Sequence, residues 1–421
     1  MTGVTAPLWV ALPIGAAFGV IAGMWGIGNP ETVIRTARLV DRLVLGCFLF
    51  VTAVGSVLLY GLHTFGVPLH FAPKPLYVFG IIVGGVLFGA GAAISGYFPG
   101  TALIALGEGR RDALAAIPGG LLGAAAWTAL FGTPLGHWLT TTANFGGIVA
   151  GGHLHDPATG RMLAIAIGYA IVALTLLKYL PRFRGGERCC LRELRGSPNS
   201  ASALDNRMKG DTIAFLYEGA LQRPGRRSTW FERACREQVA HPAFFARTIT
   251  AVGIGVATLT VLSIFLRQPF GQSTTYSWVV GELFMPDSAY SRQVIHGIGW
   301  EPFSDLGVLV GAFLAAYFIS RRFTGFRPVV PPSWRNRFGP GQGKRAVAVF
   351  IGSFLTLFGA RMAGGCTSGH ILSGGIQLSV SAWVFAGSVL AAMFVTARLV
   401  YRDANWLITP AEDEQVTVAA A

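Results

Sequence analysis

The sequence predicts an all-α polytopic membrane protein, and three features of its 421 residues predict it. Charged residues make up only 13% of the chain, against about 25% in soluble domains. Hydrophobic residues make up 52%, and the mean hydropathy is +0.54. Long apolar segments recur along the chain, and most basic residues lie between them. A lipid bilayer is therefore the expected surroundings of most of the chain.

Nine segments are candidate transmembrane helices, because a span needs about 20 predominantly apolar residues. They lie roughly at residues 6–28, 43–65, 76–97, 112–133, 161–181, 245–266, 305–320, 346–365 and 380–399. The first segment has no basic stretch before it and no small-residue cleavage site after it. This pattern favours a retained helix over a signal peptide.

The distribution of basic residues predicts the orientation of these spans. If the N-terminus lies outside, most of the 33 lysine and arginine residues fall in segments on the inside. Cytoplasmic loops of membrane proteins carry such an excess. We therefore expect a multi-pass protein of the bacterial inner membrane, with its N-terminus outside and its C-terminus in the cytoplasm.

The spans divide the chain into five parts. We expect a first membrane repeat at 1–134, a linking span at 135–181, a basic cytoplasmic loop at 182–243, a second and inverted membrane repeat at 244–400, and a cytoplasmic tail at 401–421. About 60 residues are marginal for an independent core. The loop is therefore an interfacial linker on an anionic leaflet or a docking platform for a cytosolic partner.

An internal repeat links the two membrane parts. Phe88–Thr101 and Phe358–His370 each end an apolar span and then break into glycine and small polar residues. A weaker similarity links Asp41–Leu59 with Asp305–Tyr317. One extra span lies between the two groups of four spans, so the second group is inverted in the membrane. Broken apolar segments at matching positions of inverted halves indicate a transport site, because irregular backbone at membrane depth must be buried or line a cavity.

At these residues the sequence resembles the YeeE/YedE family of sulfur-compound transporters. The match is strongest at Gly359–His370 and fair at Phe88–Thr101 and Gly28–Val33. The resemblance implies thiosulfate or a related sulfur species as substrate. It also implies a pore built from inverted repeats, with two short re-entrant segments that meet near the centre.

The resemblance further implies a cysteine in each half along the path. The cysteine of the second half is Cys366, but the matching place in the first half holds Phe98. A phenyl ring can neither donate an S–H hydrogen bond nor exchange with sulfur, and it could block the path. Phe98 therefore argues against a relay between two thiols, but it does not argue against the family scaffold.

Cys366 is the leading candidate on the substrate path. Its thiol is a weak donor and becomes nucleophilic near positive charge, although a buried cysteine is also an ordinary small apolar residue. Cys47 and the pair Cys189–Cys190 are expected to be unremarkable. No C-x-x-C motif occurs, so we expect no metal and no cofactor.

Five further polar or charged residues complete the candidate path. Arg361 is the one charge well inside a predicted span, and it either attracts an anion or caps the carbonyls of the break. His370 either donates to an anion or reaches the outer interface. Thr367 and Ser368 offer hydroxyl donors at an expected helix N-terminus, where anions are favoured, and Thr101 plays that part in the first half.

Acidic residues give little support for energy coupling. No Asp or Glu falls in the central part of a predicted span, and we expect Asp41 and Asp305 to cap helix starts. Proton-coupled carriers commonly use buried carboxylates, so this absence argues against a carboxylate relay. Uptake of a dianion opposes an inside-negative potential by about 4.6 kcal/mol per 100 mV.

These observations favour transport of a small sulfur-containing anion and leave one alternative open. In that alternative the chain has lost transport and serves as an accessory subunit of a larger membrane complex. A cytosolic sulfur-carrier protein is a further candidate partner. The net charge of +13 follows from membrane topology, so nucleic acid is not an expected partner. No G-x-S-x-G, H-E-x-x-H or Walker pattern occurs, so an enzyme is not expected.

Overall fold

The fold is helical wherever the computed structural model describes it, namely at residues 4–39, 43–152, 159–179, 244–295, 299–319, 323, 325–328 and 330–401. Isolated β-bridges are the only strand-like pairs in these ranges. Eight helices within them are long and apolar enough to cross a membrane, and Leu8–Met24 forms a shorter apolar helix. The all-α polytopic class is thus confirmed, while nine spans and two re-entrant segments stay predictions.

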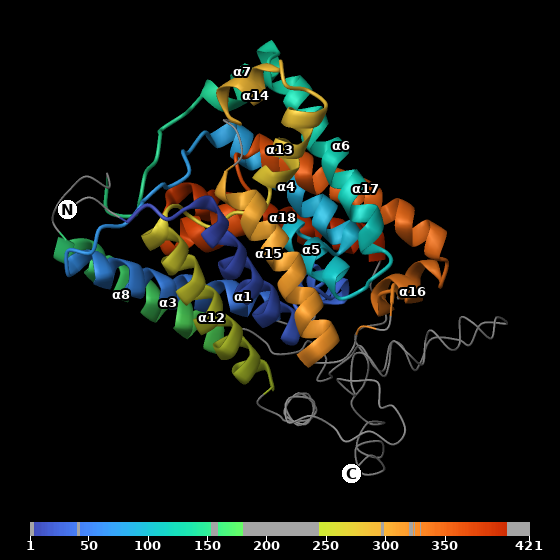
Figure 1. Cartoon of the computed structure of the whole chain (residues 1–421), viewed down its shortest axis with the longest axis horizontal. Coiled ribbons are helices and arrows are strands. Elements are labelled where there is room, and N and C mark those ends of the chain that lie inside the picture. Colours follow the sequence, from blue (N-terminus) through green and yellow to red (C-terminus); the bar gives the residue numbers. More distant parts are fainter. Residues whose placement is uncertain are drawn as a thin grey trace, which may run out of the picture.

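Eight helices form the bulk of the structure, and shorter helices join or cap them (Figure 1). The long helices are α3 (Leu43–Thr64), α4 (Val78–Ser95), α6 (Ala113–Phe131), α8 (Thr159–Tyr179), α12 (Phe244–Leu266), α15 (Trp300–Leu314), α17 (Gln342–Met362) and α18 (Val380–Tyr401). The shorter ones are η1 (Leu8–Val10), α1 (Ala11–Met24), α2 (Pro30–Ala37), α5 (Pro99–Gly107), α7 (Pro134–Thr141), α13 (Thr274–Leu283), α14 (Ala289–Gln293), η2 (Ala315–Ile319), α16 (Pro332–Phe338) and η3 (Ser368–Gly374).

The long helices pack in two groups. On one side α3 lies against α8 and α12, and α1 lies against α12 and α15; on the other, α17 lies against α4 and α6, and α4 lies against α18. Figure 1 shows α7, α13 and α14 together at one end of the bundle, and α16 near the other. The helix α5 lies between the groups, against α15 and α6.

Glycines permit a close crossing of α4 and α17. A Cβ on Gly84 would clash with the carbonyl oxygen of Gly359, and a Cβ on Gly359 would clash with that of Gly84. Gly91 and Gly352 exclude a Cβ through each other's carbonyl oxygen in the same way. Small residues at such crossings let helix backbones approach closely. The two contacts are reciprocal. Gly84 and Gly352 are corresponding glycines of the two halves, and Gly91 and Gly359 also correspond.

Both chain breaks also begin at corresponding glycines. Gly96 follows α4 with φ of 74°, and Gly364 follows α17 with φ of 78°, in the left-handed region that favours glycine. One constant offset along the sequence relates Gly84 to Gly352, Gly91 to Gly359 and Gly96 to Gly364. The same offset relates Phe98 to Cys366. This correspondence agrees with the repeat expected from the sequence, while the inversion of its second half stays a prediction.

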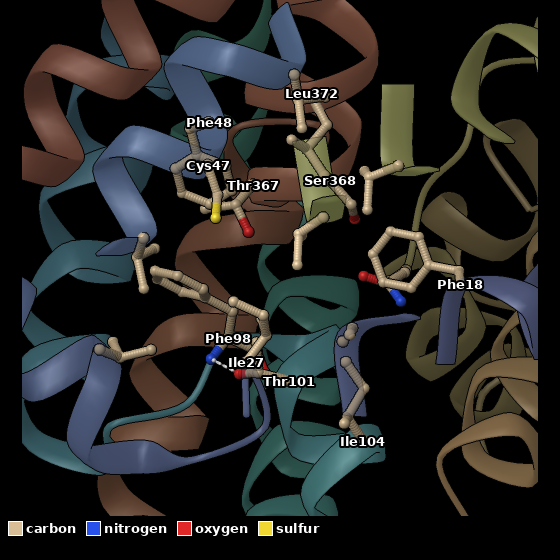
Figure 2. A pocket seen from close by; sticks show the side chains of 18 residues that line it. Phe18, Ile27, Cys47, Phe48, Phe98, Thr101, Ile104, Thr367, Ser368 and Leu372 are labelled. Carbon is tan, nitrogen blue, oxygen red and sulfur yellow. Dashed lines mark hydrogen bonds between the residues drawn. The ribbon is translucent and has the colours of Figure 1, made fainter. Parts of the chain in front are cut away.

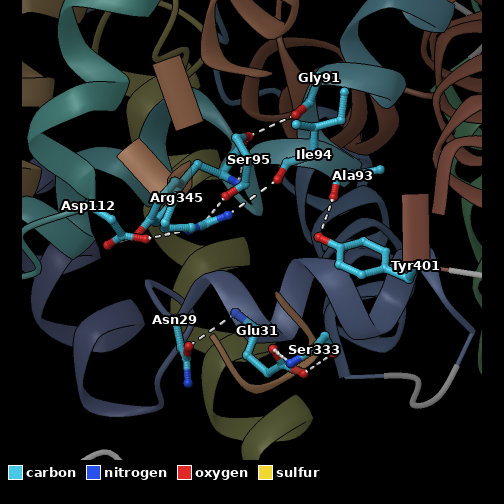
Figure 3. A network of polar contacts seen from close by, with 11 residues as sticks. Asn29, Glu31, Gly91, Ala93, Ile94, Ser95, Asp112, Ser333, Arg345 and Tyr401 are labelled. Atoms are coloured by element: carbon cyan, nitrogen blue, oxygen red, sulfur yellow. Dashed lines mark hydrogen bonds and ion pairs between the residues drawn. The ribbon is translucent and has the colours of Figure 1, made fainter. Parts of the chain in front are cut away.

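Arg345 on α17 holds the first break in place (Figure 3). Its guanidinium donates to the carbonyl oxygens of Ile94 and Ser95, at the end of α4, and lies 3.0 Å from a carboxylate oxygen of Asp112. The last carbonyls of a helix lack partners within the helix. A residue of the second half thus satisfies the helix end from which the first break starts.

The structure corrects the expectation that Asp305 caps a helix start. The helix α15 begins at Trp300, so Asp305 lies in its second turn and is 3% exposed. The helix begins before the predicted span at 305–320, and Pro302 lies in its first turn, where proline is tolerated. Glu301 in that turn also suits the helix dipole. Asp41 lies outside the described residues.

The expected cytoplasmic parts stay predictions. The loop at 182–243, with Cys189 and Cys190, and residues 402–421 of the tail lie outside the described residues. The helix α8 ends at Tyr179 before this loop, and α12 begins at Phe244 after it. The proposed five-part division of the chain therefore stays a prediction.

Candidate functional site

A small cavity lies where the two chain breaks approach each other (Figure 2). Its volume is about 60 Å³, which leaves room for only a few water molecules. Its wall is mainly apolar, and its polar side chains come from both halves of the chain: Thr101, Gln272, Thr367 and Ser368. Figure 2 shows Thr367 and Ser368 across the cavity from Phe98 and Thr101.

Phe98 forms one wall of this cavity. It lies just before α5, its side chain is 5% exposed, and its ring stacks on Phe88 with centroids 5.7 Å apart. A second, larger pocket of about 320 Å³ lies between α3, α8 and α18, and Phe98, Phe48 and Thr367 line both spaces. The phenyl ring therefore stands between the central cavity and an apolar space beside it.

Gln272 lies beside the start of α5 and supplies a buried donor that sequence reasoning missed. Thr101 accepts from the Phe98 amide at 2.8 Å, so its hydroxyl caps α5. The amide group of Gln272 occupies the space that a side chain at position 100 would need. Gln272 is 4% exposed, and its Nε2 has no hydrogen-bond partner among the described residues. A buried donor thus lines the cavity beside a helix N-terminus.

The second break contributes two hydroxyl groups to the cavity wall, whereas its thiol is not part of that wall. Thr367 and Ser368 line the cavity at the start of the helical segment that contains η3. Cys366 is 1% exposed and its sulfur lies 3.0 Å from the Ser368 hydroxyl oxygen. Cys366 therefore contacts a residue of the cavity wall without being one of the lining residues.

His370 braces the second break from inside. Its Nε2 lies 2.8 Å from the Ala363 carbonyl oxygen, and its ring stacks on Phe385 with centroids 4.7 Å apart. The side chain is 0% exposed. Of the two roles considered for His370, this burial does not fit a side chain that reaches the outer interface, and donation to an anion stays a prediction.

Arg361 binds side chains and does not cap the break. Its guanidinium donates to the Tyr290 hydroxyl at 3.0 Å, to the Ser273 hydroxyl at 3.0 Å and to the Thr274 hydroxyl at 3.1 Å. None of these partners carries a formal charge. Of the two roles considered for Arg361, these contacts do not support capping of the break carbonyls, and its guanidinium interacts electrostatically with Glu301.

Lys74 is a second cation that sequence reasoning missed. Its side chain is half-buried, with its Cε over Gly365 and Gly369. Burial lowers the pKa of Lys74, Glu301 counteracts this, and Arg361 lowers that pKa further. Lys74 and Arg361 both interact electrostatically with Cys366. Two cations thus flank the second break.

Comparison with known proteins decides the family. A family model described as sulphur transport matches residues 35–395. The chain belongs to this family, which is also called YeeE/YedE. The thiosulfate transporter TsuA of Spirochaeta thermophila is 22% identical over 397 residues, covering 94% of this chain and 99% of the relative. The resemblance noticed at the glycine-rich breaks is confirmed, and a transport role follows at the family level.

Within this family scaffold, Cys47 has more contact with the cavity than its sequence suggested. It lies on α3 and lines the cavity directly. Figure 2 shows its side chain in the wall of the cavity, which Thr367 also lines. The expectation that Cys47 has no part in transport stays untested, but its position makes it a thiol on the cavity wall.

The polar groups around the cavity share one chemistry. The described residues contain no group of three or more His, Cys, Asp or Glu side chains that could hold a metal ion, and the expected absence of a metal stays a prediction. The polar groups around the cavity are donors: hydroxyls, one amide and the start of α5. Such a set of groups suits an anion.

Proposed function

We propose that the chain carries a small sulfur-containing anion such as thiosulfate across the inner membrane, through the cavity between the two breaks. The observation that carries the proposal is the meeting of two helix starts, at α5 and at Thr367, around one cavity. Helix N-termini expose amide donors and a positive dipole end, which favour anions. The family and the thiosulfate transporter of S. thermophila support this substrate class.

The charge distribution supports a direction for the path. With the N-terminus outside, the second break faces outward and the first faces inward. Lys74 and Arg361 then attract an anion toward Cys366 from the outer side. Ser368, Thr367 and Gln272 follow as donors along the cavity wall. The anion next meets Phe98, beyond which the inner half begins.

Phe98 acts in this proposal as a gate. An apolar constriction excludes a hydrated ion, and an oxyanion that loses water there gains no donor from a phenyl ring. The present cavity of about 60 Å³ is too small for such an ion with its hydration shell. The pocket of about 320 Å³ on the other side of the ring provides space into which Phe98 can turn.

Uptake of labelled thiosulfate by cells that express Cys366→Ala tests the path. We expect at least a severalfold loss of uptake at equal membrane expression, because the thiol and its hydrogen bond to Ser368 are lost. Cys366→Ser keeps a hydrogen-bonding group of similar size and serves as the matched variant, with smaller loss. Full uptake by Cys366→Ala would remove Cys366 from the path.

The accessory-subunit alternative is favoured by one observation, the small volume of the cavity that Phe98 lines. In that reading the anion never passes, and partner proteins bind the scaffold through the basic loop at 182–243. Purified full-length protein in liposomes discriminates the two readings. Thiosulfate flux by the chain alone supports transport, and its absence from folded protein supports the accessory role.

A further inference from the structure

Two carboxylates of α15 lie behind the segment that carries Gln272. Asp305 accepts from the Thr275 hydroxyl at 2.5 Å, and Glu301, one turn earlier, accepts from the Thr274 amide at 2.8 Å. Arg361 holds the Thr274 hydroxyl. Both acids therefore fix the short segment at 272–275, whose first residue lines the cavity.

Asp305 is in an unusual position for a charged group. It is 3% exposed, and its Oδ1 has no hydrogen-bond partner among the described residues. A buried carboxylate with an unpaired oxygen is costly, and such a group avoids the cost by binding a proton. The second carboxylate, on Glu301, adds a like charge on the same helix face.

Among the described residues, the helices packed against α15 supply no compensating cation for Asp305. Of these helices, η1, α1 and α5 carry no ionisable side chain, and η2 carries Tyr317. The helix α13 carries Tyr276, whose pKa is raised by burial and by Asp305, and the exposed Glu282. Lys74 and Arg361 interact with Glu301, and Asp305 interacts with Glu301.

We propose that Asp305 is a proton-binding site that couples anion transport to the proton gradient. This inference rests on the proposed function. A proton is favoured over a metal cation, because the described residues offer no cluster of three or more acidic, His or Cys ligands. One proton carried with each dianion halves the net charge moved against the membrane potential, which is the cost that a dianion meets on entering the cell.

The coupling runs through the segment at 272–275. When Asp305 binds a proton on its unpartnered Oδ1, that oxygen becomes a donor, and Oδ2 loses its charge and accepts more weakly from the Thr275 hydroxyl. Thr275 lies three residues after Gln272 and next to Thr274, which Arg361 holds. The protonation state of Asp305 can thereby change the position of the amide donor in the cavity and of the cation near Cys366.

Infrared spectroscopy of the purified full-length chain tests proton binding without any substrate. We expect the carbonyl stretch of a protonated carboxylic acid in the wild-type protein at neutral pH and its loss in Asp305→Asn. Asp305→Glu keeps an acid and should show the band at a shifted frequency. The exposed Asp287→Asn is the matched control and should keep it unchanged. Identical bands in wild type and Asp305→Asn, with both folded, would overturn the site.

Transport in liposomes tests the coupling. With the potential clamped by potassium and valinomycin, an acid exterior of about one pH unit should drive about tenfold thiosulfate accumulation in wild type. Asp305→Asn should abolish that accumulation, and Asp305→Glu should restore part of it. If exchange proceeds but accumulation does not depend on the pH gradient, or depends on a sodium gradient instead, the proton coupling is wrong. The proposed transport function is then unaffected. Absence of all exchange contradicts the proposed function, and the infrared result then still decides whether Asp305 binds a proton.

Discussion

At the scale of single residues, the two halves differ at one pair of corresponding positions, Phe98 and Cys366. Phe98 and Cys366 stand two residues after the left-handed glycines of their breaks. One presents an aromatic ring to the cavity, and the other presents a buried thiol to Ser368. A scaffold with matching halves thus carries a barrier in one half and a sulfur contact in the other.

Lys74 gives a prediction at this scale. Lys74→Gln removes a cation near Cys366, and a unit charge pair at about 4 Å in water is worth about 1 kcal/mol, so KM for thiosulfate should rise about fivefold. The pKa of Lys74 is lowered by burial. The wild-type lysine is charged below that pKa and loses its charge as pH rises through it.

Uptake kinetics measured at several pH values check this prediction. Affinity of the wild type should weaken toward alkaline pH, and Lys74→Gln should lack that component. The exposed Lys344→Gln, which removes an equal charge away from the break, serves as control. An unchanged KM in Lys74→Gln would exclude a role for this cation in attracting the substrate.

At the scale of helices, the glycine contacts between α4 and α17 position both breaks. Gly359→Ala places a methyl group against the carbonyl oxygen of Gly84, where only backbone can yield. We expect a loss of about 1–3 kcal/mol in stability, measured as a lower thermal unfolding midpoint in detergent. Gly387→Ala on α18 meets nothing within 4 Å and is the control. Equal midpoints for the two variants would contradict the close crossing.

The sequence predicted the helices and breaks better than the groups around them. Apolar spans and glycine-rich breaks are local signals, so the positions of Phe98 and Cys366 followed from them. Gln272 and Lys74 come from segments between spans, and only tertiary packing brings them to the breaks. Asp305 was misplaced because α15 begins at Trp300, five residues before the predicted span, with Pro302 tolerated in its first turn.

At the scale of the whole molecule, the contacts describe two related halves closed over a narrow centre. The reciprocal packing of α4 and α17 and the matching breaks support alternate opening toward the two sides. Transporters with inverted repeats work by rocking or gating of one repeat against the other. In the proposed path the movement includes the Phe98 ring, because that ring lines both the cavity and the neighbouring pocket.

Thiosulfate exchange by the purified chain in liposomes, compared between wild type and Phe98→Cys, tests the central claim most directly. We predict saturable exchange by the wild type and severalfold faster exchange by Phe98→Cys, because the variant removes the ring and adds a sulfur contact. Phe65→Cys, at an exposed position before α4, controls for an added thiol and should leave the rate unchanged. If neither wild type nor Phe98→Cys exchanges thiosulfate while both are folded and inserted, the proposed path through the cavity is wrong.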